Sequence, residues 1–254
     1  MEHSQESIPK KHTLFVILST LFITNALIAE VIGAKILSVQ KLFPFFDGFN
    51  LDINMSVGVL IWPIVFILSD VINEYFGRSG VKRISFIGAA MITYAFLIIF
   101  MATEAPPADF WLSNNATDPT GNPFNIDYAY SSIFRQGLNI IIGSIIAFIV
   151  GQLVDAYTFH YIRVLTQHRW LWLRATGSTV VSQLIDSFLI LFIAFYLLGN
   201  WTFDQVLAVG IVQYLYKIII AVVLTPVIYL MHSIIDKYLG KKESLKLIGE
   251  AKDL

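Results

Sequence analysis

Residues 54–78 read NMSVGVLIWPIVFILSDVINEYFGR, an apolar run that ends on two carboxylates, an amide and a glycine. About 20 mostly apolar residues suffice for a helix to cross the hydrocarbon core of a bilayer. Asp70, Asn73 and Glu74 stand at positions i, i+3 and i+4 and therefore share one face of that helix. A carboxylate at mid-bilayer costs about 2.5–3.5 kcal/mol on insertion scales, so this face must meet protein or water. The stretch therefore predicts a transmembrane helix in a polytopic protein with a polar interior.

The rest of the chain carries the same kind of apolar segment. Of its 254 residues 56% are hydrophobic and 14% are charged, whereas soluble domains are about 25% charged. We predict an all-α membrane protein that forms a single domain over 1–254 with six transmembrane helices. The six predicted spans are 14–38, 54–75, 84–103, 137–159, 177–198 and 206–231.

The distribution of Lys and Arg orients these spans. With the N-terminus in the cytoplasm, thirteen of the seventeen Lys and Arg residues fall on inner segments and only Lys41 and Arg135 on outer ones. The positive-inside rule therefore predicts that both termini are cytoplasmic. Residues 1–13 and 237–254 are expected to be polar tails without a fold of their own. The Pro- and Asn-rich stretch 104–136 is expected to be a long outer loop, either an inert linker or a lid.

A weak internal similarity relates 66–75 to 148–157, each of which precedes a basic loop and a further span. Two inverted halves of three helices each are a common plan among transporters. The similarity is suggestive of such halves and no more.

Polar residues also lie in the middle of the fifth and sixth spans. Gln183 and Asp186 are spaced to share one face of the fifth, where a carboxylate on a one-carbon stem cannot reach either interface. They form either a hydrogen-bonded clamp between helices or a ligand-binding face. In the sixth span Gln213 and Lys217 stand at i and i+4, and Lys217 could neutralise Asp186 or Asp155.

The remaining polar candidates come from the first, second and fourth spans. Asn25, Glu30 and Lys35 do not share one helical face, because five residues rotate a helix by about 140°, and Lys35 either faces inward or extends to the interface. The acids of the second span either line a polar gate or ligand wall, or pair with Arg78, Lys82 or Arg83 at the membrane surface. Together the candidate substrate-binding residues are Asn25, Glu30, Lys35, Asp70, Asn73, Glu74, Gln152, Asp155, Gln183, Asp186, Gln213 and Lys217.

Enzymatic readings find little support in the sequence. The chain has no cysteine, which excludes thiolate catalysis and disulfides. Neither a His-Glu-x-x-His motif, a Gly-x-Ser-x-Gly motif nor a P-loop occurs. We therefore expect a protein that is not an enzyme and has no cofactor, no metal site and no nucleic-acid partner. An intramembrane enzyme and a purely structural membrane protein are the weaker alternatives to a small-molecule transporter in the bilayer, and a homo-oligomer is compatible with the sequence.

Three motifs together resemble those of a known family. They are Ala34-Lys35 in the first span, Leu68-Ser-Asp70-Val-Ile-Asn-Glu74-Tyr-Phe-Gly77 at the end of the second, and Ser182-Gln183-Leu-Ile-Asp186-Ser187 in the fifth. The chain resembles the bacterial queuosine-precursor transporters, a vitamin-uptake-like family of integral membrane proteins, over roughly 14–235. The resemblance implies a multi-pass protein of the bacterial cytoplasmic (inner) membrane.

The resemblance also implies a substrate, namely 7-cyano-7-deazaguanine or 7-aminomethyl-7-deazaguanine, used to make queuosine in tRNA. A guanine-like edge offers two adjacent donors that one carboxylate can accept in a bidentate manner. Asp186 or Glu74 could accept them, and an amide such as Gln183 or Asn25 could donate to the ring carbonyl. A rival reading is a substrate-capture subunit for a vitamin-like molecule that works with an ATP-driven partner.

Overall fold

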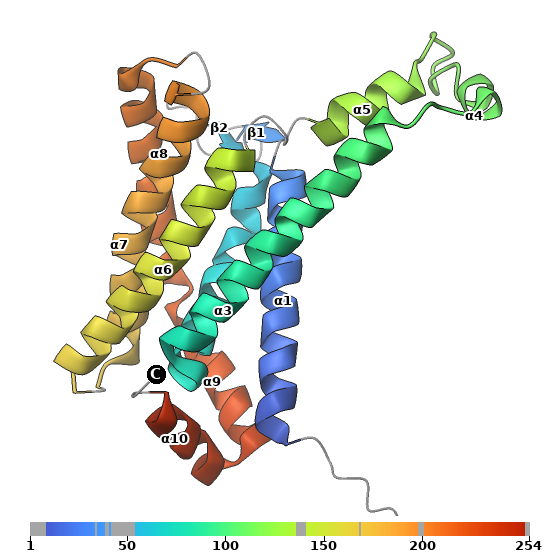
Figure 1. Ribbon diagram of the computed structural model, residues 1–254. Coiled ribbons are helices and arrows are strands. Elements are labelled where there is room, and N and C mark those ends of the chain that lie inside the picture. The colour runs from blue at the N-terminus through green and yellow to red at the C-terminus, as the bar shows by residue number, and fades with distance from the viewer. Residues whose placement is uncertain are drawn as a thin grey trace, which may run out of the picture.

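The computed structural model describes residues 9–33, 35–38, 41, 54–135, 141–167, 169–197 and 201–251 (Figure 1). The motif residue Ala34 lies outside the described residues. The chain begins with helix α1 (Lys10–Ile32), strands β1 (Ile36–Ser38) and β2 (Asn54–Ser56) and the 3-10 turn η2 (Val57–Leu60). Helices α3 (Trp62–Glu104), α4 (Asp109–Asn114), α5 (Ile126–Arg135), α6 (Ile141–Leu165) and α7 (Leu171–Leu191) follow, and α7 continues into the π-helical turn η3 (Phe192–Leu197). The last elements are helices α8 (Phe203–Val223), α9 (Thr225–Leu239) and α10 (Lys241–Glu250).

Five described helices are long and apolar enough to cross a membrane, so the prediction of an all-α membrane protein is confirmed. They are α1, α3, α6 from Gly143, α7 continued through η3, and α8. The 43-residue α3 contains residues 62–75 of the second predicted span and the whole of the third. The number of crossings and the side on which the termini lie stay predictions.

A glycine divides α3 into two arms. Gly77 has φ 68° and ψ −174°, a conformation open to glycine and costly for any residue with a Cβ. Figure 1 shows the first arm descending from the strands and the second rising again beside α1. A single element therefore holds two segments that run in opposite directions, joined by one residue rather than by a loop. We call the two ends of the bundle the strand end and the Gly77 end.

A close clamp at the strand end joins α1 to the start of α3. The Ser56 hydroxyl donates to the Gly33 carbonyl over 2.7 Å, and β1 pairs antiparallel with β2. A Cβ on Gly58 would stand 2.6 Å from the Ala29 carbonyl oxygen, so only glycine permits this approach. The predicted spans 14–38 and 54–75 are wrong at these ends. Ile36–Ser38 of the first and Asn54–Ser56 of the second pair as strands instead of continuing the helices.

The bundle packs around the first arm of α3. Phe22 of α1, Val71 and Ile72 of α3 and Phe159 of α6 are buried together in one apolar core. The outward faces of the spans keep large apolar side chains exposed, as expected for helices that meet lipid. The core thus fixes α1, α3 and α6 against one another, and α7 and α8 follow on the far side of α6.

The segments 66–75 and 148–157, compared above for a repeat, are neighbours. Two hydrogen bonds four residues apart link α3 to α6 in the same direction, from Ser69 to Gln152 and from Asn73 to the Ala156 carbonyl. The two helices therefore run parallel, and this pair by itself does not support inverted halves.

The C-terminal segment is folded, contrary to the prediction for 237–254. Residues 241–250 form α10, whose Ser244 and Leu247 are buried, and which packs against α3 and α9. The spacing of Ser244, Leu247 and Ala251 gives one buried face, which the basic composition of the tail concealed. At the other terminus α1 begins at Lys10, within the predicted tail 1–13. The Lys10 ammonium donates a hydrogen bond to the Tyr238 carbonyl over 3.1 Å. Both described termini thus lie at the Gly77 end (Figure 1).

The stretch 104–136 contains α4 and α5 at the opposite end of the bundle (Figure 1). Arg135, the last residue of α5, links the stretch back to the end of α3. It donates a hydrogen bond to the Thr103 carbonyl over 2.9 Å and forms an ion pair with Glu104. The stretch thus contains two helices, and its role as a linker or a lid stays a prediction.

Candidate functional site

The seam between α3 and α6 is polar at two successive turns. The Ser69 hydroxyl donates to Gln152 Oε1 over 2.9 Å, and Asn73 Nδ2 donates to the Ala156 carbonyl over 3.2 Å. All of these side chains are buried. The seam brings Asp70 of α3 close enough to Asp155 of α6 for the two carboxylates to interact electrostatically. Asn73 and Gln152, predicted as site residues, thus act as bridges between helices.

Asp155 is held by hydroxyl groups of α7. It accepts a hydrogen bond from the Ser182 hydroxyl over 3.1 Å and also contacts the Ser178 hydroxyl. Both serines are buried. Asp155 therefore has neutral donors around it and is not paired with Lys217. The sequence had offered Asp155 as one of two possible partners of Lys217.

Lys217 of α8 instead pairs with Asp186 of α7, with 2.5 Å between Nζ and Oδ2. The Lys217 side chain is 10% exposed and that of Asp186 23%. Gly151 of α6 packs against the Asp186 side chain, since a Cβ at Gly151 would lie 3.4 Å from the Asp186 Cβ, an ordinary van der Waals contact. The prediction that Lys217 neutralises an intramembrane carboxylate is confirmed for Asp186.

The first-span candidates do not come together. Glu30 accepts a hydrogen bond from the Ser144 hydroxyl of α6 over 2.6 Å and lies near enough to Asp186 to interact with it. Asn25 donates to the Leu21 carbonyl of its own helix. Lys35 lies beyond the end of α1 and is exposed. Of the three, only Glu30 joins the polar interior.

A narrow pocket lies between the first arm of α3, α7, α8 and α9. Its lining includes Pro63, Phe66, Asp70, Thr176, Thr179 and Ile220. A second small pocket shares Pro63, Phe66 and Ile220 with it and reaches Lys217. The two form a track from the ion pair of α7 and α8 to Asp70, and we refer to them together as the pocket.

Four buried side-chain oxygens of α3 and α7 have no hydrogen-bond partner among the described residues, namely Asp70 Oδ1, Glu74 Oε2, Gln183 Oε1 and Ser187 Oγ. Thr176, Thr179 and Gln183 stand at i, i+3 and i+7 on α7, so Gln183 continues the face that lines the pocket. Gln213 is half-buried one turn before Lys217. A buried polar atom without a partner costs about 1–3 kcal/mol, so the bundle keeps these atoms at a cost.

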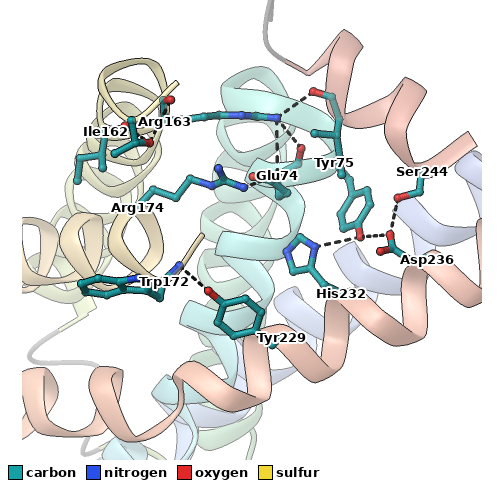
Figure 2. Close-up of polar contacts among 12 residues, drawn as sticks. Glu74, Tyr75, Ile162, Arg163, Trp172, Arg174, Tyr229, His232, Asp236 and Ser244 are labelled. Carbon is teal, nitrogen blue, oxygen red and sulfur yellow. Dashed lines mark hydrogen bonds and ion pairs between the residues drawn. The ribbon is translucent and has the colours of Figure 1, made fainter. Parts of the chain in front are cut away.

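Glu74, one turn beyond Asp70, is already paired. Arg174 Nη2 of α7 lies 2.6 Å from Glu74 Oε1, and Arg163 Nη2 of α6 lies 3.9 Å from the same oxygen (Figure 2). The Arg163 guanidinium also donates to the Glu74 carbonyl over 3.3 Å. The arginines are 1% and 4% exposed. We call these three residues the ion cluster.

The sequence did not identify this cluster. Arg163 and Arg174 were counted among the charges of an inner loop, and the expected partners of Glu74 were Arg78, Lys82 and Arg83. In the structure α6 runs to Leu165 and α7 starts at Leu171, so both arginines lie within helices and turn into the bundle. Arginines in the last turn of one apolar helix and the first turns of the next were the only available signal.

A second polar group, also unforeseen, lies beside the ion cluster. The Tyr75 hydroxyl donates to Asp236 Oδ1 over 2.9 Å and stands 3.1 Å from His232 Nδ1, and the two rings stack (Figure 2). The Ser244 hydroxyl of α10 donates to the same Asp236 oxygen. Burial lowers the pKa of His232, and the nearby Arg174 and Arg163 lower it further against the opposing effect of Glu74 and Asp236. This group joins α3, α9 and α10.

Apolar spans with polar side chains turned toward one another define a polytopic α-helical membrane protein with an interior suited to a small molecule. The model of a family described as "Putative vitamin uptake transporter" matches residues 56–231. The chain belongs to this family of transporters, which confirms the resemblance seen in its motifs. Its substrate class is therefore a small molecule and its environment the lipid bilayer.

Curated relatives cover most of the chain. A "Probable queuosine precursor transporter" of Bacillus subtilis is 28% identical over 178 residues, 70% of this chain and 71% of the relative. One of the same name from Haemophilus influenzae is 25% identical over 69% of this chain and 67% of its own length. The "Queuosine precursor transporter" of Escherichia coli is 24% identical over 76% of this chain and 80% of its own length. No solved structure matches the chain.

Proposed function

We propose that this protein imports queuosine precursors, the 7-deazaguanine bases 7-cyano-7-deazaguanine or 7-aminomethyl-7-deazaguanine, across the bacterial cytoplasmic membrane. The family match and the names of three relatives, each matched over about two thirds of its length or more, support this assignment. The proposal includes the predicted topology of six crossings with both termini inside.

The unsatisfied carboxylate of Asp70 is the observation that carries the proposal. Asp70 lines the pocket from α3, and its Oδ1 has no hydrogen-bond partner among the described residues. The edge of a guanine-like base has two adjacent N–H donors, which a carboxylate accepts in a bidentate manner. A bound base would thus satisfy an atom that the protein leaves unsatisfied.

The other polar groups divide between recognition and support. Gln183 offers an amide on the pocket-lining face of α7, suited to the carbonyl and ring nitrogens of the base. Phe66 lines both parts of the pocket and gives the ring an aromatic face to stack on. Asp186, one of the two carboxylates that the sequence offered for reading the base, is engaged by Lys217. We therefore assign base reading to Asp70 and assign the Asp186–Lys217 pair to the entrance of the pocket.

The pocket is narrow in this conformation, so admission of a bicyclic base requires α3 and α8 to separate. Pro63, Phe66 and Ile220 line both parts of the track between these helices. Opening and closing of packed helices around a ligand is a common motion in transport proteins. The structure is suited to the closed state of such a cycle.

The experiment is uptake by the purified protein in liposomes. We expect a labelled 7-deazaguanine base to accumulate inside, and unlabelled 7-deazaguanines to compete with it better than guanine or a panel of vitamins. Empty liposomes are the control. Uptake only after an ATPase partner is added would instead support the substrate-capture alternative. Recovery of a chemically changed ligand would support an enzyme, and equal competition by every compound would contradict the proposed specificity.

A further inference from the structure

The ion cluster lies next to the pocket, on the side of the Gly77 end. Asp70 lines the pocket, and Glu74 follows it one helical turn later. On α7, Ala175 lines the pocket and Arg174 precedes it. A ligand that leaves the pocket along the seam between α3 and α7 toward this end meets the contact between Glu74 Oε1 and Arg174 Nη2, which are 2.6 Å apart and buried.

Helix α10 covers the ion cluster from outside. Arg163 Nη2, which lies within 3.9 Å of Glu74 Oε1, also donates to the Ile248 carbonyl of α10 over 2.9 Å. Ser244 of α10 and Tyr75, the neighbour of Glu74, bind the same oxygen of Asp236 (Figure 2). One helix thus engages both an arginine of the cluster and, through Asp236, the residue beside Glu74.

The corner between α9 and α10 leaves room for a change in backbone direction. Gly240 has φ 87°, a conformation that glycine adopts without strain, and no atom lies within 4 Å of where its Cβ would be. Hinges are commonly a few residues at the ends of elements that absorb a large backbone change. The hydrogen bond between Ser244 and Asp236 crosses this corner, so a swing of α10 about Gly240 must break it.

We propose that α10 is the latch of an inner gate formed by Glu74, Arg163 and Arg174. While α10 is docked, the Ile248 carbonyl holds Arg163 against Glu74 and the pocket is closed at the Gly77 end. When α10 swings away about Gly240, Arg163 loses this acceptor, the cluster separates and the ligand leaves. The inference rests on the proposed function and on the predicted cytoplasmic side of the Gly77 end.

The test is a reversible lock across the Gly240 corner. The chain has no cysteine, so Asp236→Cys with Ser244→Cys introduces the only two thiols, at side chains already in contact. A short bis-thiosulfonate reagent joins them, and a reductant releases them. We expect the locked protein in liposomes to take up labelled 7-deazaguanine at least tenfold more slowly than the same protein after reduction. Binding of the base in detergent should stay within about twofold.

Each outcome bears on the latch separately from the substrate. Equal uptake before and after reduction would overturn the latch, and so would loss of binding in the locked protein. Absence of uptake by the unaltered chain would instead overturn the proposed substrate. In that case the latch is tested without a substrate, by labelling Thr176→Cys in the pocket with an impermeant maleimide added at the Gly77 end.

The rate of this labelling is compared between two variants, each of which lacks one serine hydroxyl. Ser244→Ala removes the bond to Asp236, whereas Ser113→Ala in α4 removes a bond to the Phe110 carbonyl of the same short helix. We expect Thr176→Cys to react at least threefold faster with Ser244→Ala and at an unchanged rate with Ser113→Ala. Equal rates for the two variants would overturn the latch.

Discussion

The ion cluster and the pocket are adjacent on the same helices, yet they treat charge in opposite ways. In the ion cluster the Glu74 carboxylate meets two buried guanidinium groups and joins α3 to α6 and α7. One turn away, in the pocket, Asp70 Oδ1 has no hydrogen-bond partner among the described residues; Glu74 Oε2 lacks one too, but the other oxygen of Glu74 lies in two ion pairs. Matched charges hold helices in place, whereas unmatched polar atoms cost stability and persist where a ligand can satisfy them. The same residue type thus serves structure in one turn and recognition in the next.

The largest expected effect is on stability and comes from Glu74→Gln. It leaves two buried arginines facing an uncharged amide, and the loss of one partner of a buried ion pair costs about 3–5 kcal/mol. Thermal unfolding in detergent measures it. The matched control is Glu104→Gln, which breaks a pair with Arg135 whose side chains are 55% and 38% exposed, and which should cost about 1 kcal/mol or less. Equal losses from the two substitutions would break the comparison.

The next effect is on binding and comes from Asp70→Asn. The amide presents a donor where the base also presents donors, so affinity for a 7-deazaguanine should fall at least tenfold. The melting temperature should hold or rise, because a poorly satisfied buried carboxylate is removed. Calorimetric titration and thermal unfolding of the same sample check both. A large drop in melting temperature with unchanged affinity would show that Asp70 is structural.

A smaller effect is expected at the entrance, where Asp186 is partly exposed. Asp186→Asn should weaken binding less than Asp70→Asn does, and it should destabilise the protein by about 1 kcal/mol through the loss of a charged hydrogen bond. Combined with Lys217→Met in a double-mutant cycle, it should show a coupling energy above about 0.5 kcal/mol. If Asp186→Asn abolishes binding while Asp70→Asn is mild, the roles of the two carboxylates are exchanged.

The smallest effect concerns pH. Burial lowers the pKa of His232 in the folded protein, so below the unfolded value of about 6.5 the unfolded chain binds more protons. Stability must then decrease as the pH falls below about 6.5 and be independent of this residue above it. His232→Gln should flatten that part of the profile of melting temperature against pH. A slope that is the same in both proteins would show that burial does not lower the pKa of His232 in the folded protein.

The apolar segments were predictable because a bilayer imposes their length and composition. The polar face of the fifth span was predictable for the same reason, since Asp186 has a stem too short to reach the interface, whereas the sequence left open whether the acids of the second span lie at the membrane surface. The pairing of Lys217 with Asp186 followed from charge. The choice of Asp186 over Asp155 as the partner of Lys217 could not be predicted, because it depends on how α8 packs on α7.

The ion cluster and α10 were beyond the sequence reasoning, since both depend on tertiary contact. Arg163 looks like a loop charge until α6 is seen to continue past it. The buried face of α10 is short and interrupted by lysines, and its partners lie on α3, α6 and α9. The outer limits of the first two spans were missed because strand pairing is a long-range contact across 33–58.

The clamp at Gly33, Ser56 and Gly58 also gives the molecule a fulcrum. Backbones that approach this closely cannot slide, so any tilt between α1 and the first arm of α3 pivots there. Helix α1 has 23 residues, which at 1.5 Å per residue makes a lever of about 35 Å, so a rotation of about 10° moves its far end by about 6 Å. Such a rotation would leave the strand end almost in place and would displace the other end of α1 most. That end holds Lys10, whose ammonium donates a hydrogen bond to the Tyr238 carbonyl of α9.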